Sequence, residues 1–171
     1  MGPYKHVRPG LPPLLEVVLL PDPRPTSFYF DPDSSDRRAP ESEASAAREL
    51  MSRLVQKQGA EELGDWLSSE IPDLRVRARV LMHALLERGS KSYTHVTVLM
   101  KRYRDVIDTL CAEALEDGVE VEVEMLYAVE DVWRSAPHQI VVLVGKLLEQ
   151  EAVAGSHVAT WAFQAREDVP E

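Results

Sequence analysis

YTHVTVLMKRYRDVIDTLCAEA, residues 93–114, is the stretch with the clearest periodicity in the chain. Its apolar residues recur at gaps of three and four, which places them on one face of an α-helix about six turns long. With Ser92 as its cap, the pattern predicts one amphipathic helix over residues 92–116. The apolar face consists of Tyr93, Val96, Met100, Tyr103, Ile107, Leu110 and Ala114.

Helical patterns also lie on both sides of this stretch. Pro72 or Asp73 suits the first turn of one helix, Gly89 suits its C′ position, and Pro137 suits the first turn of another. The run VEVEVE, residues 119–124, alternates like a strand, but we assign it to a helix because a single strand would have no partner. The predicted helices are 44–57, 60–67, 73–88, 92–116, 120–134, 137–151 and, capped by Ser156, 157–166.

Short connections between these helices predict that neighbours fold back antiparallel. The expected fold is all-α, with helix hairpins stacked as a HEAT-like α-solenoid. Residues 73–88 would pair with 92–116, and 120–134 with 137–151. The last helix carries Trp161 and Phe163 and needs a partner, which is either the preceding hairpin or further chain.

The first 43 residues have a different character. They hold nine of the twelve prolines, which disfavour helix, so residues 1–43 are expected to be an extended segment and linker. Within them SFYF, residues 27–30, is apolar enough to dock on the rest of the molecule. Residues 44–171 form the expected helical-repeat domain.

Composition excludes several classes of protein. The formal net charge of −10 disfavours nucleic-acid binding over most of the surface. A single cysteine, Cys111, excludes a disulfide framework within the chain and fits a reducing compartment. Residues 14–20 are too short an apolar run for a membrane span, which needs about 20 residues.

Catalytic and metal sites find no support among the residue patterns. The sequence contains no P-loop, dinucleotide fingerprint, zinc motif or calcium loop. His83 and His95 lie on different helices without ligands at zinc spacing, and Ser92 is better placed as a helix cap than as a nucleophile. We therefore expect no enzyme activity, no cofactor, no metal and no small-molecule substrate.

Two basic clusters and one aromatic pair are the candidate binding residues. The alternatives are ordinary surface charge for the clusters and inward packing of the last helix for the aromatic pair. The candidate RNA or partner surface consists of Arg75, Arg77, Arg79, Lys101, Arg102 and Arg104. The candidate exposed partner helix carries Trp161 and Phe163.

Four stretches resemble a known family: GSKSYTH (89–95), YRDVIDTL (103–110), VWRSAPHQIVVLVGKLLEQEAV (132–153) and VATWAF (158–163). They are similar to the third helical domain of the large subunit of the nuclear cap-binding complex. That subunit is built from repeats like the middle domain of initiation factor 4G. More weakly, LLPDPRPTSFYF (19–30) looks like the proline-rich passage that precedes that domain.

The resemblance implies a nuclear scaffold without chemistry of its own. In that family a small subunit with an RNA-recognition motif holds the 7-methylguanosine cap, and the large subunit supports it and recruits mRNA processing and export factors. This chain would then meet capped RNA only indirectly. The alternative is a stand-alone helical adaptor for protein–protein contacts, unrelated to caps.

Overall fold

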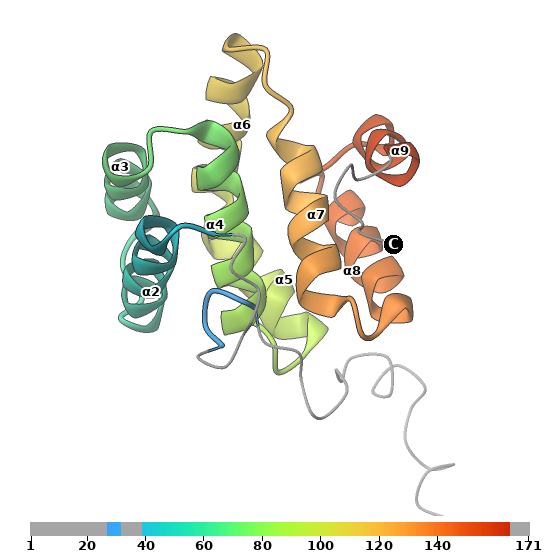
Figure 1. Ribbon diagram of the computed structural model, residues 1–171, viewed down its shortest axis with the longest axis horizontal. Coiled ribbons are helices and arrows are strands. Elements are labelled where there is room, and N and C mark those ends of the chain that lie inside the picture. The colour runs from blue at the N-terminus through green and yellow to red at the C-terminus, as the bar shows by residue number, and fades with distance from the viewer. Residues whose placement is uncertain (1–26, 32–38, 165–171) are drawn as a thin grey trace, which may run out of the picture.

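The computed structural model describes residues 27–31 and 39–164, and within them it is all-helical. The prediction of an all-α helical repeat is confirmed (Figure 1). The helices are α2 (Glu41–Val55), α3 (Ala60–Glu70), α4 (Leu74–Arg88), α5 (Tyr93–Arg102), α6 (Arg104–Glu116), α7 (Val121–Trp133), α8 (Pro137–Glu149) and α9 (Gly155–Phe163). The predicted proline-rich passage lies mostly outside the described residues.

Helix α4 lies in the middle of this arrangement. It packs between α2 and α7, with α5 and α6 also against it, while α8 and α9 cover the other side of α7 (Figure 1). Every residue from Val80 to Leu86 is buried. A helix that is buried all round must be surrounded by other elements, so α4 is the core around which the others assemble.

Local signals placed several helix starts correctly. The Asp73 carboxylate accepts a hydrogen bond from the Val76 N–H at 3.0 Å, and Ser92 Oγ accepts one from the His95 N–H at 3.3 Å. Pro137 occupies the first position of α8. The VEVEVE run begins α7, as predicted, and its Val121 and Val123 are buried.

The single helix predicted over residues 92–116 is wrong in one respect, because it breaks into α5 and α6 at Tyr103. All seven residues of its apolar face are nevertheless buried. Tyr103 leaves the helical region, with φ −103° and ψ 22°, and its hydroxyl donates to the Gln58 carbonyl at 3.0 Å. The periodicity of the sequence indicates which face of the helix is buried. It does not indicate the hydrogen bond from Tyr103 to the turn between α2 and α3.

Several helix ends also differ from the prediction. Helix α2 begins three residues earlier, at Glu41, and α9 begins at Gly155, so Ser156 is not its cap. The left-handed residues that follow α2 and α8 are Lys57 (φ 57°) and Glu151 (φ 56°) rather than glycines. The predicted end of the last helix, at residue 166, lies outside the described residues. Helix α9 packs back on α7, so the first of its two expected partners is the observed one.

Gly89 is required for a reason that the sequence did not show. Its φ of −87° is accessible to any residue, so the expected left-handed cap is absent. Instead, a Cβ at this position would lie 2.8 Å from Val96 Cα and 2.9 Å from Val96 N. The absence of a side chain lets the first turn of α5 approach the end of α4.

Gly89→Ala should therefore destabilise the fold by about 1–3 kcal/mol, because the added methyl group meets backbone atoms of α5. Urea unfolding followed by circular dichroism measures the effect. Gly145→Ala is the matched control: it lies within α8 with no atom within 4 Å of the added Cβ. That control should be neutral or stabilising by up to about 1 kcal/mol. Equal midpoints for the two variants would contradict the close-approach argument.

Candidate interaction surfaces

A row of polar residues runs along one side of α4, where α2 and α7 meet it. The residues are spaced four apart, so they lie on neighbouring turns of the same helix face. We call them the α4 polar row: Arg75, Arg79, His83 and Glu87. Partners from other elements meet them: Arg75 pairs with Glu124 (3.8 Å), Arg79 with Glu43 (3.9 Å), His83 with Asp131 (3.8 Å), and Glu87 accepts from the Ser27 N–H (2.9 Å).

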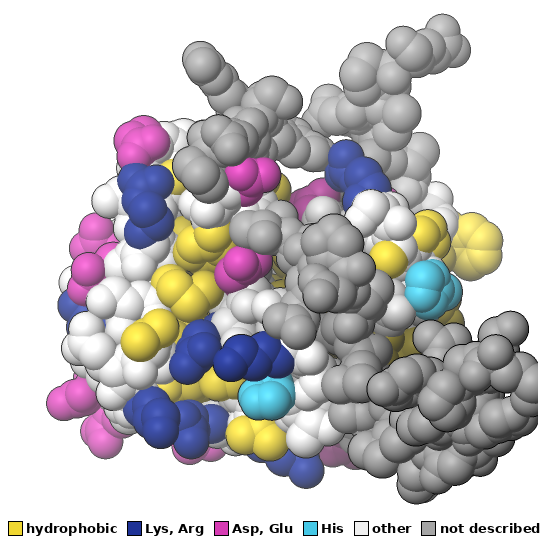
Figure 2. Space-filling view, turned by 90° about the horizontal axis from the view of Figure 1, so that it is seen from below, with side chains coloured by type: hydrophobic (Ala, Val, Ile, Leu, Met, Phe, Trp, Pro, Cys, Tyr) yellow, Lys and Arg dark blue, Asp and Glu magenta, His cyan; other side chains and the backbone are white. Residues whose placement is uncertain are grey.

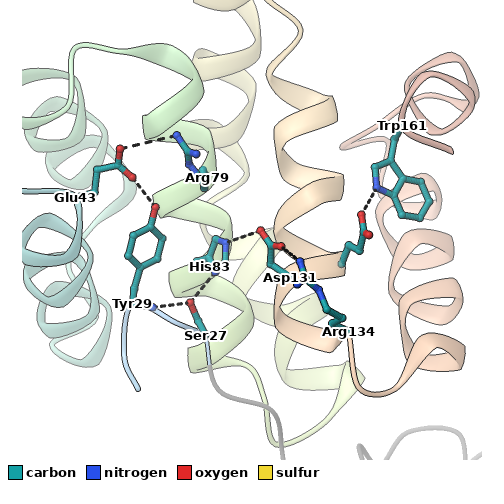
Figure 3. Close-up of polar contacts among 9 residues, drawn as sticks. Ser27, Tyr29, Glu43, Arg79, His83, Asp131, Arg134 and Trp161 are labelled. Atoms are coloured by element: carbon teal, nitrogen blue, oxygen red, sulfur yellow. Dashed lines mark hydrogen bonds and ion pairs between the residues drawn. The ribbon is translucent and has the colours of Figure 1, made fainter. Parts of the chain in front are cut away.

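The SFYF segment docks on this row, as its apolar character predicted (Figure 3). Tyr29 is only 4% exposed, and its hydroxyl donates to Glu43 Oε2 at 2.8 Å. The rings of Phe28 and Tyr29 lie edge-on to the His83 imidazole, with centroids 4.8 and 5.0 Å away. The segment thereby joins α2 to α4 at one place.

Ser27, His83 and Asp131 are the residue types of a hydrolase triad, but their geometry is different. Ser27 Oγ lies 2.6 Å from His83 Nδ1, whereas a triad serine pairs with Nε2. The 3.8 Å from His83 Nε2 to Asp131 Oδ2 is too long for a hydrogen bond. Ser27 and His83 are 1% and 0% exposed, so no substrate reaches them. His83 is a fully buried structural histidine.

Burial shapes the titration of this cluster. It raises the pKa of the Tyr29 phenol, and the hydrogen bond to the neighbouring Glu43 carboxylate raises it further. Burial also raises the pKa of Glu87, which the hydrogen bond from the Ser27 N–H partly offsets. Both pKa shifts thus result mainly from the burial of the two groups.

The half-buried Cys111 lies on α6, away from this cluster. Desolvation by burial is the largest cause that raises the pKa of its thiol, to about 12, and the negative charge of Glu122 is the second. The thiol therefore stays protonated and unreactive at neutral pH.

Arg77, from the first basic cluster, is buried. Its Nε donates to the Ile71 carbonyl at 2.8 Å, and its terminal nitrogens donate to Glu113 Oε2 at 2.6 Å and to the Pro72 carbonyl at 3.3 Å. The guanidinium thus ties the α3–α4 connection to α6. It also lines a cavity of about 420 Å³ between α3, α4 and α6, whose other charged lining residues are acidic: Glu61, Asp65, Asp105 and Glu113.

Arg104, from the second cluster, is also engaged within the molecule. It donates to Asp108 at 2.7 Å and to the carbonyls of Gln150 and Glu151, which follow α8. A cation at the carboxyl end of a helix neutralises unpaired carbonyls. With Arg75 and Arg79 in the α4 polar row, this leaves two of the six candidates, Lys101 and Arg102, exposed without a contact among the described residues.

Lys101 and Arg102 belong to a larger basic patch that the two predicted clusters did not reveal. Between Glu87 and Asp105 the chain carries five lysines or arginines, one histidine and no carboxylate. Figure 2 shows dark blue side chains gathered around a histidine on the face where α4 ends and α5 lies. The signal available in the sequence was the missing carboxylates, rather than the spacing of the cations.

Trp161 and Phe163 separate in the structure although both lie on α9. Trp161 packs against the core and donates from Nε1 to Glu130 Oε2 at 3.1 Å (Figure 3). Phe163 is 88% exposed, and Val141 on α8 is 73% exposed. The outer side of α8 and α9 is therefore partly apolar.

Metal binding and membrane crossing find no support in the described part of the chain. No group of three or more histidine, cysteine or carboxylate residues there is arranged to hold a metal ion. Among the same residues, no helix has the length and apolar character to cross a membrane.

The class of protein that the structure defines is a helical repeat. Charged side chains near its core pair between helices, as α4 does with α2, α6 and α7. Comparison with known proteins gives the family: residues 33–170 match the MIF4G-like family, and the chain belongs to it.

Curated relatives share low identity with the chain. It is 25% identical over 152 residues to nuclear cap-binding protein subunit 1 of Arabidopsis thaliana, a match that covers 87% of this chain and 17% of the relative. The corresponding protein of Anopheles gambiae is 27% identical over 117 residues, covering 68% and 14%. That of Xenopus tropicalis is 30% identical over 88 residues, covering 52% and 10%. The chain thus spans a small part of these relatives.

Arg77→Met should destabilise the protein by about 2–3 kcal/mol, because it leaves the Ile71 carbonyl and the Glu113 carboxylate without their donor. The control is Arg75→Met, which removes a 57% exposed arginine of the same helix and should cost no more than about 0.5 kcal/mol. Chemical denaturation of both variants measures the difference. A cost for Arg77→Met no larger than the control's would show that the buried arginine is dispensable.

Tyr29→Phe should cost about 1 kcal/mol, because it removes the hydroxyl that binds Glu43 while keeping the ring in place. Tyr127→Phe is the matched control, since its hydroxyl makes a 3.3 Å exposed contact with Gln164 and its loss should change stability by less than about 0.5 kcal/mol. Thermal unfolding compares the two. Similar losses in both would mean that the docked segment contributes nothing through this hydrogen bond.

Proposed function

We propose that this chain is a non-catalytic scaffold of the kind found in the large subunit of the nuclear cap-binding complex. The observation that carries the proposal is its membership of the MIF4G-like family, together with a match to nuclear cap-binding protein subunit 1 over 87% of its length. A helical repeat offers extended surfaces for partners rather than a closed site for a substrate.

The environment of the side chains that could act as nucleophiles or bases supports the lack of catalytic activity. Ser27 and His83 are buried where the docked segment meets α4, and Cys111 keeps its proton. Arg77 is committed to the α3–α4 connection. None of these groups combines reactivity with access to solvent, which a nucleophile or general base needs.

The proposed partner is a small cap-binding subunit with an RNA-recognition motif. This chain would support that subunit, contact capped RNA through it, and recruit mRNA processing and export factors in the nucleus. The names of the relatives, which place them in nuclear cap binding, support this assignment. A stand-alone adaptor without any link to caps is the alternative that the experiment separates.

The outer side of α8 and α9 is the surface proposed for a protein partner. Phe163 and Val141 stand largely free in solvent there, while Trp161 fixes α9 to α7 through Glu130. Large apolar side chains left exposed on a repeat protein are typical of an interaction surface.

A pull-down with a purified small cap-binding subunit tests the proposal. The chain should be retained, and Phe163→Glu should reduce its retention about tenfold or more, because the partner would have to bury a charge. Leu115→Glu is the matched control: Leu115 is also a large apolar residue, 82% exposed, but on α6.

If Phe163→Glu is lost while Leu115→Glu is retained at the level of the unmodified chain, the contact is assigned to α9. Equal losses in both variants would contradict the proposed surface. Failure of the unmodified chain to associate with the small subunit would favour the adaptor without a link to caps.

A further inference from the structure

The basic patch at the end of α4 and on α5 is a surface that the proposed scaffold role does not use. Its members are Arg88, Lys91, His95, Lys101 and Arg102. Lys91, Lys101 and Arg102 are exposed, and Arg88 is half-buried. Among the contacts of the described residues, none engages the charged group of any of these four cations. They differ in this from Arg75, Arg77, Arg79 and Arg104, each of which forms an ion pair with a carboxylate of the chain.

The geometry of α5 presents these groups together. Tyr93, Val96 and Met100 take the buried side of the helix, so the outer side is left to His95 and Arg102, with Lys101 adjacent. Helix α5, Tyr93–Arg102, is about 15 Å long at a rise of about 1.5 Å per residue. A helix of that length can lie beside several backbone phosphates of one nucleic-acid strand.

The net charge of −10 does not cancel this local field. At physiological ionic strength the Debye length is about 8 Å, so exposed carboxylates farther away are largely screened. The 17 residues from Arg88 to Arg104 contain no carboxylate. A polyanion lying along α5 therefore meets a stretch of chain that carries several positive charges and no carboxylate of its own.

We propose that the patch formed by Arg88, Lys91, His95, Lys101 and Arg102 binds the phosphate backbone of single-stranded RNA. The contact is to phosphates rather than to stacked bases, because the two tyrosines of this segment, Tyr93 and Tyr103, are buried. Phosphate contacts carry no sequence information, so binding should not depend on base sequence. The RNA would thus touch the scaffold directly, in addition to any contact made through a small cap-binding subunit. This inference does not depend on that subunit.

Fluorescence anisotropy with a labelled, uncapped oligouridylate tests the proposal on the full chain alone. Lys91→Glu, Lys101→Glu and Arg102→Glu combined should weaken binding about tenfold or more, because three phosphate contacts are lost. The slope of log affinity against log salt concentration should fall in magnitude by about 2, at roughly 0.7 per phosphate for a single strand.

The matched control carries Arg48→Glu, Arg75→Glu and Lys146→Glu, which change the net charge equally but lie on α2, α4 and α8. The side chains of Arg48, Arg75 and Lys146 are 53%, 57% and 37% exposed, so the fold should persist, and circular dichroism verifies it for both triple variants. Affinity of the control within about threefold of the unmodified chain, together with the loss in the α5 variant, would support the proposal.

Three results would overturn it: no RNA binding by the unmodified chain at low salt, equal losses in both triple variants, or unchanged binding in the α5 variant. An acidic peptide of polyglutamate is the competitor. If it displaces the RNA at lower concentrations than unlabelled oligouridylate does, the patch belongs to an acidic protein partner and the RNA assignment fails.

Discussion

The structure depends on the burial of α4 between its neighbours. This helix carries an unbroken buried stretch, Val80–Leu86, and yet it also carries Arg77 and His83, which are 6% and 0% exposed. Burying a polar or charged group costs several kcal/mol unless it finds a partner. Each neighbouring element must therefore supply one: Glu43 comes from α2, Glu113 from α6, Asp131 from α7, and Ser27 from the docked segment. The positions of the polar side chains on α4 thus determine where its neighbours need polar partners.

This constraint changes how residue types are interpreted. A serine, a histidine and an aspartate that meet in a fold suggest chemistry, and clustered arginines suggest nucleic acid. Around α4 such residues instead bind partners within the fold: Ser27 Oγ lies 2.6 Å from His83 Nδ1, and Arg77 donates to Glu113. The charged side chains that can meet a partner are those that make no contact with the core, such as Lys101 and Arg102 on the outer side of α5. In a scaffold, the residues left over from packing are the better candidates for recognition.

Most of the helices could be predicted because their periodicity records which side is buried. The seven residues of the 93–114 face are all buried, and Asp73, Ser92 and Pro137 begin their helices as local rules require. The break at Tyr103 could not be predicted, because it depends on a hydrogen bond to Gln58, 45 residues away in sequence. The burial of Arg77 could not be predicted either. In the sequence it resembles the neighbouring surface arginines, and only the folded chain brings the Ile71 carbonyl and Glu113 to it. Gly89 shows the third kind of limit, since its role is set by the approach of Val96.

The resemblance to cap-binding large subunits is carried largely by residues that build the fold. Trp133 is fully buried, Pro137 starts α8, and Trp161 joins α9 to Glu130 on α7. A likeness that rests on such positions transfers the architecture securely, because packing requires those side chains whatever the partner. The partner contacts that we propose, by contrast, fall on exposed residues such as Phe163 and Lys101, whose identities packing does not constrain. Helix α9 holds both kinds of residue within three positions: Trp161, which joins it to α7, and Phe163, which the fold leaves exposed.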